Sequence, residues 1–424
     1  MIKILQVRNV DSFVESRRQK TSEKDRKTVQ LILNDVRKNG DSAVKKYEQK
    51  FNGKSISQLR VSAKEIKEAQ SKIRTKTRSA IRRADSALFA SDVDLRRWVE
   101  GFTNKHYSWV LKQSFVPIPS VGCYIPGGQA RYPSSVVMSV TTAKRAGVKR
   151  IVVVSPPGRD GKIDPLTIVA AKICGATEIY KVGGAQAIGA LACGTKSIPK
   201  VDKIVGPGGK FVSIAKSLVS DQTAIDMIAG PTELGIIADT NANPELVALD
   251  LISQAEHSKD TMCFVITTSK TVAKQIQKSL EKLIPDVERS AIVKQSISKN
   301  GFIAVCKNQN EMIELANKIA PEHMELMVKN AKTLSKKITG AGLLLIGKNT
   351  PSAASDYLLG SNHILPTNGF GRTRGGLSVL DFIKLQTVVE SRADELLFFQ
   401  HQLKALTDAE GLPNHYKAVK RRLD

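Results

Sequence analysis

Aromatic residues are scarce in this chain, and long apolar runs are absent from it. Only 5% of the 424 residues are aromatic, which leaves little material for the stacking surfaces of nucleic-acid-binding proteins. No apolar run reaches the length needed to span a bilayer. The first residues also lack the apolar core and small-residue cleavage site of a secretory signal. We therefore expect a cytoplasmic protein without a membrane contact.

Cysteines are few, odd in number and widely spaced. They are Cys123, Cys174, Cys193, Cys263 and Cys306. This spacing excludes a disulfide framework and a CxxC metal site. Four of the five lie in apolar surroundings, where cysteine usually serves as a small core residue. Cys123 lies beside a candidate functional loop, but we expect all five to be chemically inert.

Positive charge is in excess. Lysine and arginine number 65 against 40 acidic residues, so the formal net charge is +25. Such an excess is compatible with a polyanionic partner. However, the basic residues are dispersed over segments such as SKIRTKTRSAIRRADS (71–86), and no zinc-finger or RNP-type motif accompanies them. A solvated basic surface is therefore the better explanation, and we expect no nucleic-acid partner.

The pattern of apolar residues changes along the chain. A chain of this length predicts two or three domains. Residues 1–110 have mainly helical spacing. From about residue 115, short apolar runs alternate with helix-like stretches, which is typical of βαβ units around parallel sheets. Read in order, the chain predicts one α/β sheet over about 120–232, a second over about 233–350, and a helical tail from about 376.

Two histidine-containing segments could carry chemistry on a metal. Gln254 and His257 in SQAEH are three residues apart near the end of a predicted helix, which puts them on one face. Asp356 could add a carboxylate oxygen, and His415 a second imidazole. Such mixed ligation suits zinc and would also admit manganese or cobalt. Taken singly, these residues are equally compatible with surface or capping roles.

The dipeptide Glu322–His323 follows a helix breaker, Pro321, so it falls in a loop or at a strand start. An adjacent carboxyl group and imidazole can divide the work of activating water and moving protons near neutral pH. A strand-edge pair without a catalytic role has the same sequence, and the residues alone leave both interpretations open.

Three glycine-rich loops follow strand-like runs. They are IPGG (125–128), VGGAQ (182–186) and VGPGG (205–209). A glycine-rich loop between a strand and a helix is where α/β sheets bind nucleotides. Neither GxGxxG nor GxxxxGK[ST] occurs, so an ordinary dinucleotide fingerprint and a P-loop ATPase are both disfavoured.

Seven motifs together resemble the histidinol dehydrogenase family. In order they are VGCYIPGG, VGGAQAIGALACGT, PKVDKIVGPG, AGPTE, LISQAEH, APEHMEL and SDYLLGSNHILPT. The resemblance runs from about residue 20 to about residue 420. It implies an NAD-dependent oxidoreductase with one Zn²⁺ per site, which oxidises L-histidinol through L-histidinal to L-histidine at the end of histidine biosynthesis.

The resemblance also implies roles for individual residues. Glu322 and His323 match the catalytic acid–base pair. The zinc ligands would be Gln254, His257, Asp356 and His415, with zinc mainly positioning the substrate. The other substrate-contacting positions match Thr232, His363 and Glu410, and the zinc ligands and His323 would contact the substrate as well. The cofactor-binding positions match Tyr124, Gln186 and Gly209.

The fold implied by the resemblance is α/β. It has two incomplete Rossmann-like domains, the first inserted into the second, with helical arms at both ends of the chain. The arms embrace a partner, so a homodimer with shared active sites is expected. In this arrangement residues 1–19 form the N-terminal arm, 20–123 and 233–375 the catalytic domain, 124–232 the inserted NAD-binding domain, and 376–424 the C-terminal dimerisation arm.

The sequence departs from the family pattern in three respects. The family's GPGN is GPGG here, so Gly209 lacks the asparagine side chain that contacts NAD in other members. AGPSE is AGPTE, but Thr232 keeps the hydroxyl group. The large positive charge is unusual for the family. A scaffold that had lost catalysis would be expected to lack some ligand or acid–base residues, and all six are present.

Overall fold

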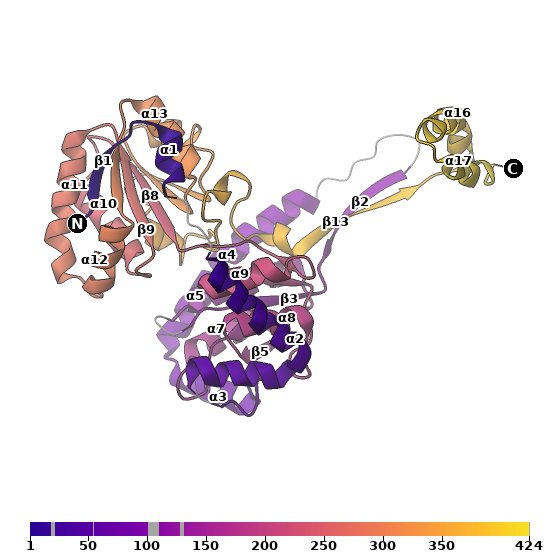
Figure 1. Cartoon of the computed structure of the whole chain (residues 1–424), viewed down its shortest axis with the longest axis horizontal. Helices are drawn as coiled ribbons and strands as arrows, with labels where there is room; N and C mark the ends of the chain where they lie inside the picture. The colour runs from indigo at the N-terminus through magenta and orange to yellow at the C-terminus, as the bar shows by residue number, and fades with distance from the viewer. Residues whose placement is uncertain (18–21, 54, 101–109, 128–130, 424) are drawn as a thin grey trace. The chain divides into compact units, whose positions relative to one another are not determined.

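The computed structural model describes residues 1–17, 22–53, 55–100, 110–127 and 131–423. Its contacts divide the chain into two compact units. Unit 1 comprises Met1–Asp92 and Ile118–Phe382, and unit 2 comprises Val93–Pro117 and Ile383–Asp424. Both expected α/β sheets lie in unit 1 (Figure 1). Gly128 of the expected IPGG loop, and residues 18 and 19 of the expected N-terminal arm, fall outside the described residues.

The first sheet is formed by five parallel strands. They are β3 (Ser120–Tyr124), β4 (Arg150–Ser155), β5 (Glu178–Lys181), β6 (Lys203–Val205) and β7 (Ala224–Ile225). The hydrogen-bonded order is β5-β4-β3-β6-β7. The apolar runs of β3, β4, β5 and β6 are buried, as expected for a parallel sheet covered on both faces. The carboxyl ends of the central strands β3 and β6 therefore lie next to each other.

Helices surround this first sheet. They are α2 (Glu23–Asn52), α3 (Ala63–Lys72), α4 (Thr75–Glu100, of which the part up to Asp92 is in unit 1), α5 (Pro133–Val136), the π-helical turn η1 (Val137–Thr141), α6 (Thr142–Ala146), α7 (Pro165–Cys174), α8 (Gly184–Cys193) and α9 (Lys210–Val219). Leu33 and Val36 of α2 share a buried core with Ile188 and Leu191 of α8. At Gly189 an added Cβ would lie 3.1 Å from the Leu33 side chain, so glycine allows the close approach of the two helices.

This packing corrects two of the expected domain boundaries. The family arrangement predicts that residues 20–123 join residues 233–375. Instead, the buried side chains of α2 pack on the first sheet, and β3 pairs with β4 and β6 at the centre of that sheet. The physical reason is the apolar face of α2, which is covered by α8 and α9. The expected first sheet over about 120–232 is confirmed by β3 to β7.

The second sheet also has parallel strands. They are β1 (Lys3–Gln6), β8 (Glu233–Ala238), β9 (Met262–Thr267), β10 (Phe302–Val305), β11 (His323–Met327) and β12 (Leu343–Ile346). The order is β1-β10-β9-β8-β11-β12. The accompanying helices and turns are α1 (Val10–Glu15), α10 (Pro244–Ala255), α11 (Lys270–Leu283), η2 (Ile284–Asp286), α12 (Ser290–Lys299), α13 (Gln309–Ile319), α14 (Ala331–Ser335), α15 (Ser352–Ser355), η3 (Phe370–Arg372) and η4 (Val379–Phe382).

The start of the chain belongs to this second sheet. β1 pairs in parallel with β10, with Lys3 opposite Phe302, and α1 packs on α13. Figure 1 shows the indigo β1 beside strands that come about three hundred residues later. The expectation of a helical N-terminal arm is therefore wrong for residues 3–15, because the apolar side chains of this segment complete the core of the sheet.

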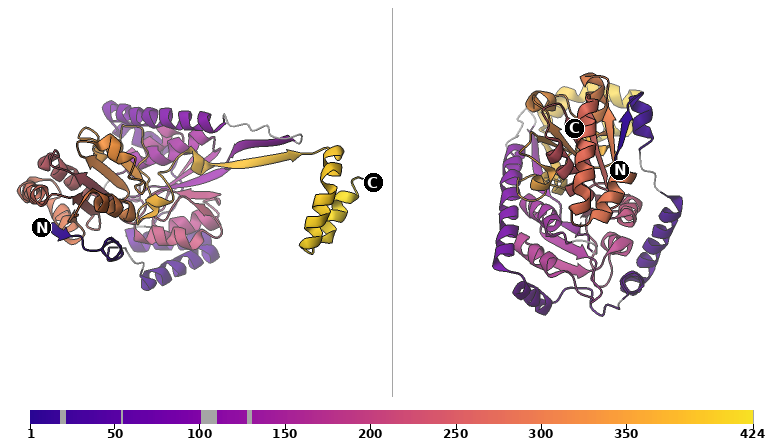
Figure 2. Two further views of the ribbon diagram at one scale, coloured as in Figure 1. Left: turned by 90° about the horizontal axis from the view of Figure 1, so that it is seen from above. Right: turned by 90° about the vertical axis from the view of Figure 1, so that its left-hand side faces the viewer.

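Unit 2 contains the last turns of α4 from Val93 on, an antiparallel ribbon and two further helices. β2 (Val110–Pro117) pairs along its whole length with β13 (Ile383–Glu390). They are followed by α16 (Ala393–Ala409) and α17 (Pro413–Lys420), which pack against each other (Figure 2). The expectation of a helical tail from about 376 is therefore wrong for residues 383–390, which form the strand β13. The segment IKLQTVVE is rich in β-branched residues, which favour a strand.

No helix in the described part of the chain is both long enough and apolar enough to cross a bilayer. The cysteines of the described residues are all free, and four of them are buried. Burial raises the pKa of the Cys123 thiol to about 12, so this cysteine stays protonated at neutral pH. This agrees with the inert role expected for it.

Candidate active site

The centre of the site is a hydrogen-bonded chain of three side chains. Gln254, in the last turn of α10, donates its Nε2 to the Thr232 Oγ1 at 2.7 Å. The Thr232 hydroxyl in turn donates to the Glu322 carboxylate. The Glu322 Oε2 also accepts the backbone N–H of Glu233 at 2.9 Å. Gln254 and Glu322 are buried, so these hydrogen bonds are shielded from bulk water and fix the orientation of both side chains.

These residues meet because two neighbouring strands start side by side. β8 begins at Glu233 and β11 begins at His323, and the two strands pair in parallel with His323 opposite Leu234. Pro321 lies between the end of α13 and the start of β11, as the sequence predicts. The cluster therefore occupies the amino ends of central strands, whereas ligands of open α/β sheets usually bind at the carboxyl ends.

Glu233 supports this cluster from within the protein. Its Oε2 accepts the backbone N–H of Glu322 at 3.2 Å, and its Oε1 accepts that of Asn368 at 3.0 Å. Burial raises the pKa of Glu233 to about 8, and the pKa of Glu322 is also raised by burial. Two neighbouring carboxyl groups in a low dielectric resist carrying two negative charges at once.

His323 lies between two carboxyl groups. Its Nδ1 is 3.8 Å from the Glu322 Oε2, and its Nε2 is 3.3 Å from the Asp356 Oδ1. Burial alone would lower the pKa of His323, but the Asp356 and Glu322 carboxylates outweigh burial and raise it to about 9. Among the described residues neither ring nitrogen has a well-aligned hydrogen bond. The imidazole is thus held by charge and is free to exchange a proton with a third group.

Two further histidines surround Asp356. The His363 Nδ1 is 2.8 Å from the backbone carbonyl of Asp356, and its Nε2 is 3.2 Å from the Ser135 hydroxyl of α5. His257 lies just beyond the end of α10, where its backbone N–H bonds to the Gln254 carbonyl at 3.2 Å. Burial would raise the pKa of Asp356, but His323, His363 and His257 outweigh it and lower that pKa. Three imidazoles therefore act on one carboxylate.

The expected cofactor residues gather at the carboxyl edge of the first sheet. Tyr124 ends β3, and its hydroxyl accepts the backbone N–H of Gly184 at 3.1 Å. Gln186, in the first turn of α8, donates its Nε2 to the Glu48 carboxylate at 2.8 Å. The same Glu48 oxygen accepts the backbone N–H of Gly183 at 2.8 Å. The Gln186 Oε1 is buried without a hydrogen-bond partner among the described residues, which leaves it available to a ligand.

Gly209 is the N-cap of α9 and has an ordinary negative φ of −66°. An added Cβ there would meet nothing within 4 Å. Gly206, in the same loop, differs in both respects: its φ is +113°, and an added Cβ would collide with the backbone carbonyl of Tyr124. The loop therefore needs glycine at 206 and tolerates a side chain at 209.

Glu410 and His415 lie in unit 2. Glu410 caps the end of α16, and His415 is exposed on α17. Their assignment to the site stays a prediction.

Comparison with known proteins places the chain in a family. The family model for histidinol dehydrogenase matches residues 15–423. The chain is 43% identical over 405 residues to histidinol dehydrogenase of Methanococcus maripaludis, covering 94% of this chain and 93% of that one. It is 42% identical to that of Bacillus cereus over 398 residues, covering 94% and 92%. The chain belongs to the histidinol dehydrogenase family. A crystal structure of the enzyme from Elizabethkingia anophelis matches the fold with a TM-score of 0.93 at 33% identity, covering 100% of this chain and 98% of that one.

The zinc that resemblance to histidinol dehydrogenases implies can be compared with the side chains present. Asp356 Oδ1 is buried without a hydrogen-bond partner among the described residues, and the charge of His257 acts on it. The Gln254 amide nitrogen is engaged by Thr232, which leaves its oxygen as the ligand atom. No group of three or more His, Cys, Asp or Glu in the described residues forms a metal centre. The zinc ligands therefore stay a prediction.

Sequence patterns missed three contributors to this histidinol dehydrogenase site. Glu48 lies in a lysine-rich helix with no motif around it, and Glu233 ends the AGPTE motif, from which only Thr232 was assigned a role. Ser135 lies in a run of small residues. The sequence signal for Glu48 is a single carboxylate within an apolar spacing, which becomes informative once burial is known.

Proposed function

We propose that this oxidoreductase catalyses the zinc-dependent, NAD-linked oxidation of L-histidinol through L-histidinal to L-histidine, the last steps of histidine biosynthesis in the cytoplasm. Family membership supports the substrate and the reaction. The observation that carries the mechanism is the buried pair Glu322–His323, oriented by Thr232 and Asp356 at the start of two adjacent strands.

The first step is the oxidation of the alcohol. The unprotonated form of His323, whose share grows as the pH rises toward its pKa of about 9, accepts the hydroxyl proton of histidinol while the carbon bearing the hydroxyl loses a hydride to NAD⁺. The products are histidinal, NADH and the proton held by His323. Asp356, 3.3 Å from the His323 Nε2, stabilises the imidazolium that this proton transfer creates.

The second step is the oxidation of the aldehyde. Glu322 takes a proton from water as the water oxygen attacks the aldehyde carbon, and the carbonyl oxygen takes the proton that His323 holds, which gives the hydrated aldehyde. Loss of a second hydride to another NAD⁺, with removal of a hydroxyl proton, gives the carboxylic acid. Glu322 is suited to hold this proton because burial raises its pKa. Thr232 keeps the carboxyl group oriented between the two proton transfers.

Zinc would be held by Gln254, His257, Asp356 and His415, and when bound it supplies a Lewis-acidic centre that positions the imidazole and amino nitrogens of the substrate. Thr232, His363 and Glu410 would contact the substrate itself. The hydrogen bond from Thr232 to Glu322 supports the role of Thr232, because it places the Thr232 hydroxyl beside the catalytic carboxyl group, where the substrate would bind. His363 is held on both sides by Ser135 and the Asp356 carbonyl, which fixes its ring.

The first sheet would bind NAD as an incomplete Rossmann-like domain. Numbered within the sheet, its strand order is 3-2-1-4-5, which follows the start of the dinucleotide-binding order. Tyr124 ends the first of these strands, and the loop from Gly206 to Gly209 follows the fourth. Cofactors bind where such an order reverses, and that place lies between these two strands. The second sheet repeats the order from β8 onward, with β1 added at its edge.

Unit 2 would act as the dimerisation arm. Leu397, Phe398 and Leu406 of α16 are exposed, and apolar side chains in such number need a covering surface. A twofold dimer in which each arm completes the partner's site accounts for this surface and for the distance in sequence between His415 and the other ligands.

The decisive experiment is stoichiometric. Purified, zinc-loaded protein with L-histidinol and excess NAD should form two NADH for each histidine. Formation of a single NADH with histidinal as the final product would overturn the two-step proposal, and no NADH from histidinol would overturn the substrate.

A further inference from the structure

A second concave site lies on the helices of the first sheet. It has a volume of about 360 Å³ and is lined by Gln70 of α3, Arg78 and Arg82 of α4, and Val169, Lys172 and Ile173 of α7. None of these residues is among the candidate active-site residues. Arg78 and Arg82 come from the basic segment 71–86, for which the proposed reaction has no use. The hollow thus combines three cationic side chains with an apolar floor.

No counter-ion for the three cations lies among the described residues. Among the described residues, the Arg78, Arg82 and Lys172 side chains form neither an ion pair nor a hydrogen bond. The Nε of Arg78 is buried and unsatisfied. A buried guanidinium nitrogen without an acceptor costs free energy, so an acceptor from outside the chain would stabilise this arrangement.

Acidic residues on the neighbouring elements are engaged elsewhere. On α3, Glu65 pairs with Lys181 at 2.9 Å, and Glu68 pairs with Lys162 at 3.0 Å. On α4, Asp85 accepts the Thr141 hydroxyl at 2.6 Å, and its carboxylate lies one turn from Arg82. Asp92 and Asp94 follow Arg82 by ten and twelve residues, which is more than two turns of the helix. α7 contains no acidic residue.

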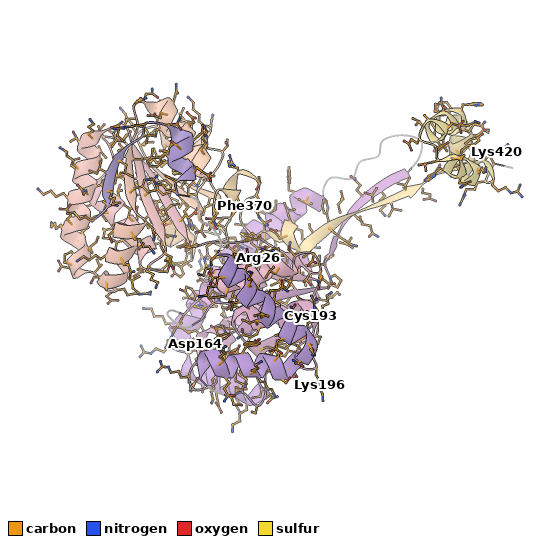
Figure 3. All side chains as sticks on the ribbon, viewed as in Figure 1. Arg26, Asp164, Cys193, Lys196, Phe370 and Lys420 are labelled. Carbon is orange, nitrogen blue, oxygen red and sulfur yellow. The ribbon has the colours of Figure 1, made fainter. Side chains whose placement is uncertain are left out.

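The nearest acid along α7 is also remote from the hollow. Asp164, labelled in Figure 3, caps the opposite end of α7 from Lys172 and pairs with Arg131 at 3.0 Å. Eight residues of helix separate Asp164 from Lys172, which is about 12 Å along the axis. The three cations of the hollow therefore outnumber the carboxylate of Asp85 beside them, and the net charge there stays positive.

We propose that this hollow is a binding site for a small phosphate-bearing anion, of the diphosphate or phosphorylated-metabolite class. Two arginines present planar forks that match phosphate oxygens, and Lys172 adds a point charge. Val169 and Ile173 supply an apolar surface for the carbon skeleton of such a ligand. Among the described residues no aromatic side chain lines the hollow, so a nucleobase would find no stacking surface there.

A small anion fits the shape better than nucleic acid does. The volume lies at the lower end of small-molecule sites. A polynucleotide would require an extended basic track with aromatic platforms, whereas here the cations converge on one hollow formed by three helices. The site would also account for part of the unusual positive charge of the chain.

The test is direct binding of inorganic diphosphate to the full-length protein by isothermal titration calorimetry. We expect one site per chain, with affinity reduced about tenfold or more in Arg82→Gln and, separately, in Lys172→Gln. Both side chains are exposed, so neither substitution should disturb folding. The matched control is Arg83→Gln, which removes the same charge from the next residue of α4, outside the hollow, and should bind as the unaltered protein does.

Three outcomes would overturn the proposal. One is the absence of diphosphate binding at millimolar concentration. Another is an equal loss of binding in Arg83→Gln, which would indicate a diffuse surface charge. The third is that a single-stranded oligonucleotide binds with steep salt dependence while diphosphate does not compete, which would favour a nucleic-acid surface instead. NADH formation from histidinol without diphosphate should be unchanged in all three variants, so this test is independent of the catalytic proposal.

Discussion

The hydroxyl of Thr232 donates to the carboxylate of Glu322 while accepting the amide of Gln254. One small side chain thus joins an expected zinc ligand to the proposed water-activating group. Because Gln254 and Glu322 are both buried, a substitution at any of the three positions should alter the orientation of the other two side chains.

Substitution of the acid–base pair should separate the two oxidation steps. Glu322→Gln should impair the oxidation of histidinal more than that of histidinol, because only the aldehyde step requires an activated water. His323→Ala should slow both steps, by about a hundredfold or more. Pre-steady-state measurement of each half-reaction checks this. Thr232→Ser keeps the hydroxyl and serves as the control with near-normal rates; an unchanged aldehyde step in Glu322→Gln would remove that residue from its role.

Metal content should follow the proposed ligands. We expect about one tightly held zinc per chain, with activity lost on chelation and regained when zinc is added. His257→Ala should lower both zinc content and turnover. His401→Ala, an exposed histidine of α16 outside the proposed ligand set, should change neither. Atomic absorption together with NADH formation provides the measurement, and full activity in verified metal-free protein would contradict the proposal.

Gly209→Asn should strengthen cofactor binding. The substitution meets no steric obstacle, since an added Cβ has open space and the φ is negative. Asparagine is also a good N-cap for α9. If its side chain contacts NAD as in other family members, the KM for NAD should fall about three- to tenfold, the value of one hydrogen bond. Gly206→Asn, which would strike the Tyr124 carbonyl, should instead unfold at lower temperature. An unaltered KM in a folded Gly209→Asn protein would show that this contact is dispensable.

Glu233 should make stability dependent on pH. Its pKa is raised from 4.5 to about 8, chiefly by burial, so the folded protein retains a proton that the unfolded chain releases above about pH 4.5. Its contribution is therefore complete below pH 4.5 and is lost as the pH rises toward 8. Glu233→Gln should reduce the decline of the unfolding free energy over this window, by at most about 1.4 kcal/mol per pH unit. Urea titrations at several pH values measure this, with the exposed Glu281→Gln as the control; parallel profiles for all three proteins would refute it.

Shared active sites should be visible in mixed dimers. Glu322→Ala and His415→Ala should each be nearly inactive as homodimers. When their subunits exchange, one site combines the intact body of the second variant with the intact arm of the first, and that site should be active. If no activity returns in mixed dimers whose formation has been verified, each chain builds its site alone.

The sequence predicted the local structure of the site well and the long-range packing poorly. The interruption at Pro321 correctly placed Glu322 in the loop before β11 and His323 at the start of that strand, since proline ends a helix by local sterics. The apolar runs of β4 and β8 likewise identified two sheets.

By contrast, nothing near α2 in the sequence indicates that it covers α8, about 150 residues later. β13 was missed because its apolar residues are exposed in unit 2, so its spacing carries no burial signal. The hydrogen bond between Gln186 and Glu48 could not be predicted for the same reason, because it depends on the packing of α2 against α8.

The pairing of β1 with β10 has a consequence for synthesis on the ribosome. The four residues of β1 are made first, yet their hydrogen-bonding partners at 302–305 emerge about three hundred residues later. The helices and strands of the first sheet, which lie between them in sequence, can fold as soon as their own residues have emerged. The second sheet is therefore completed after the first sheet has folded. The N-terminal segment of the nascent chain must stay unpaired until β10 has emerged. A long extension fused ahead of Lys3 would therefore interfere with the pairing of β1 with β10, at a stage when the edge of β10 is still unpaired.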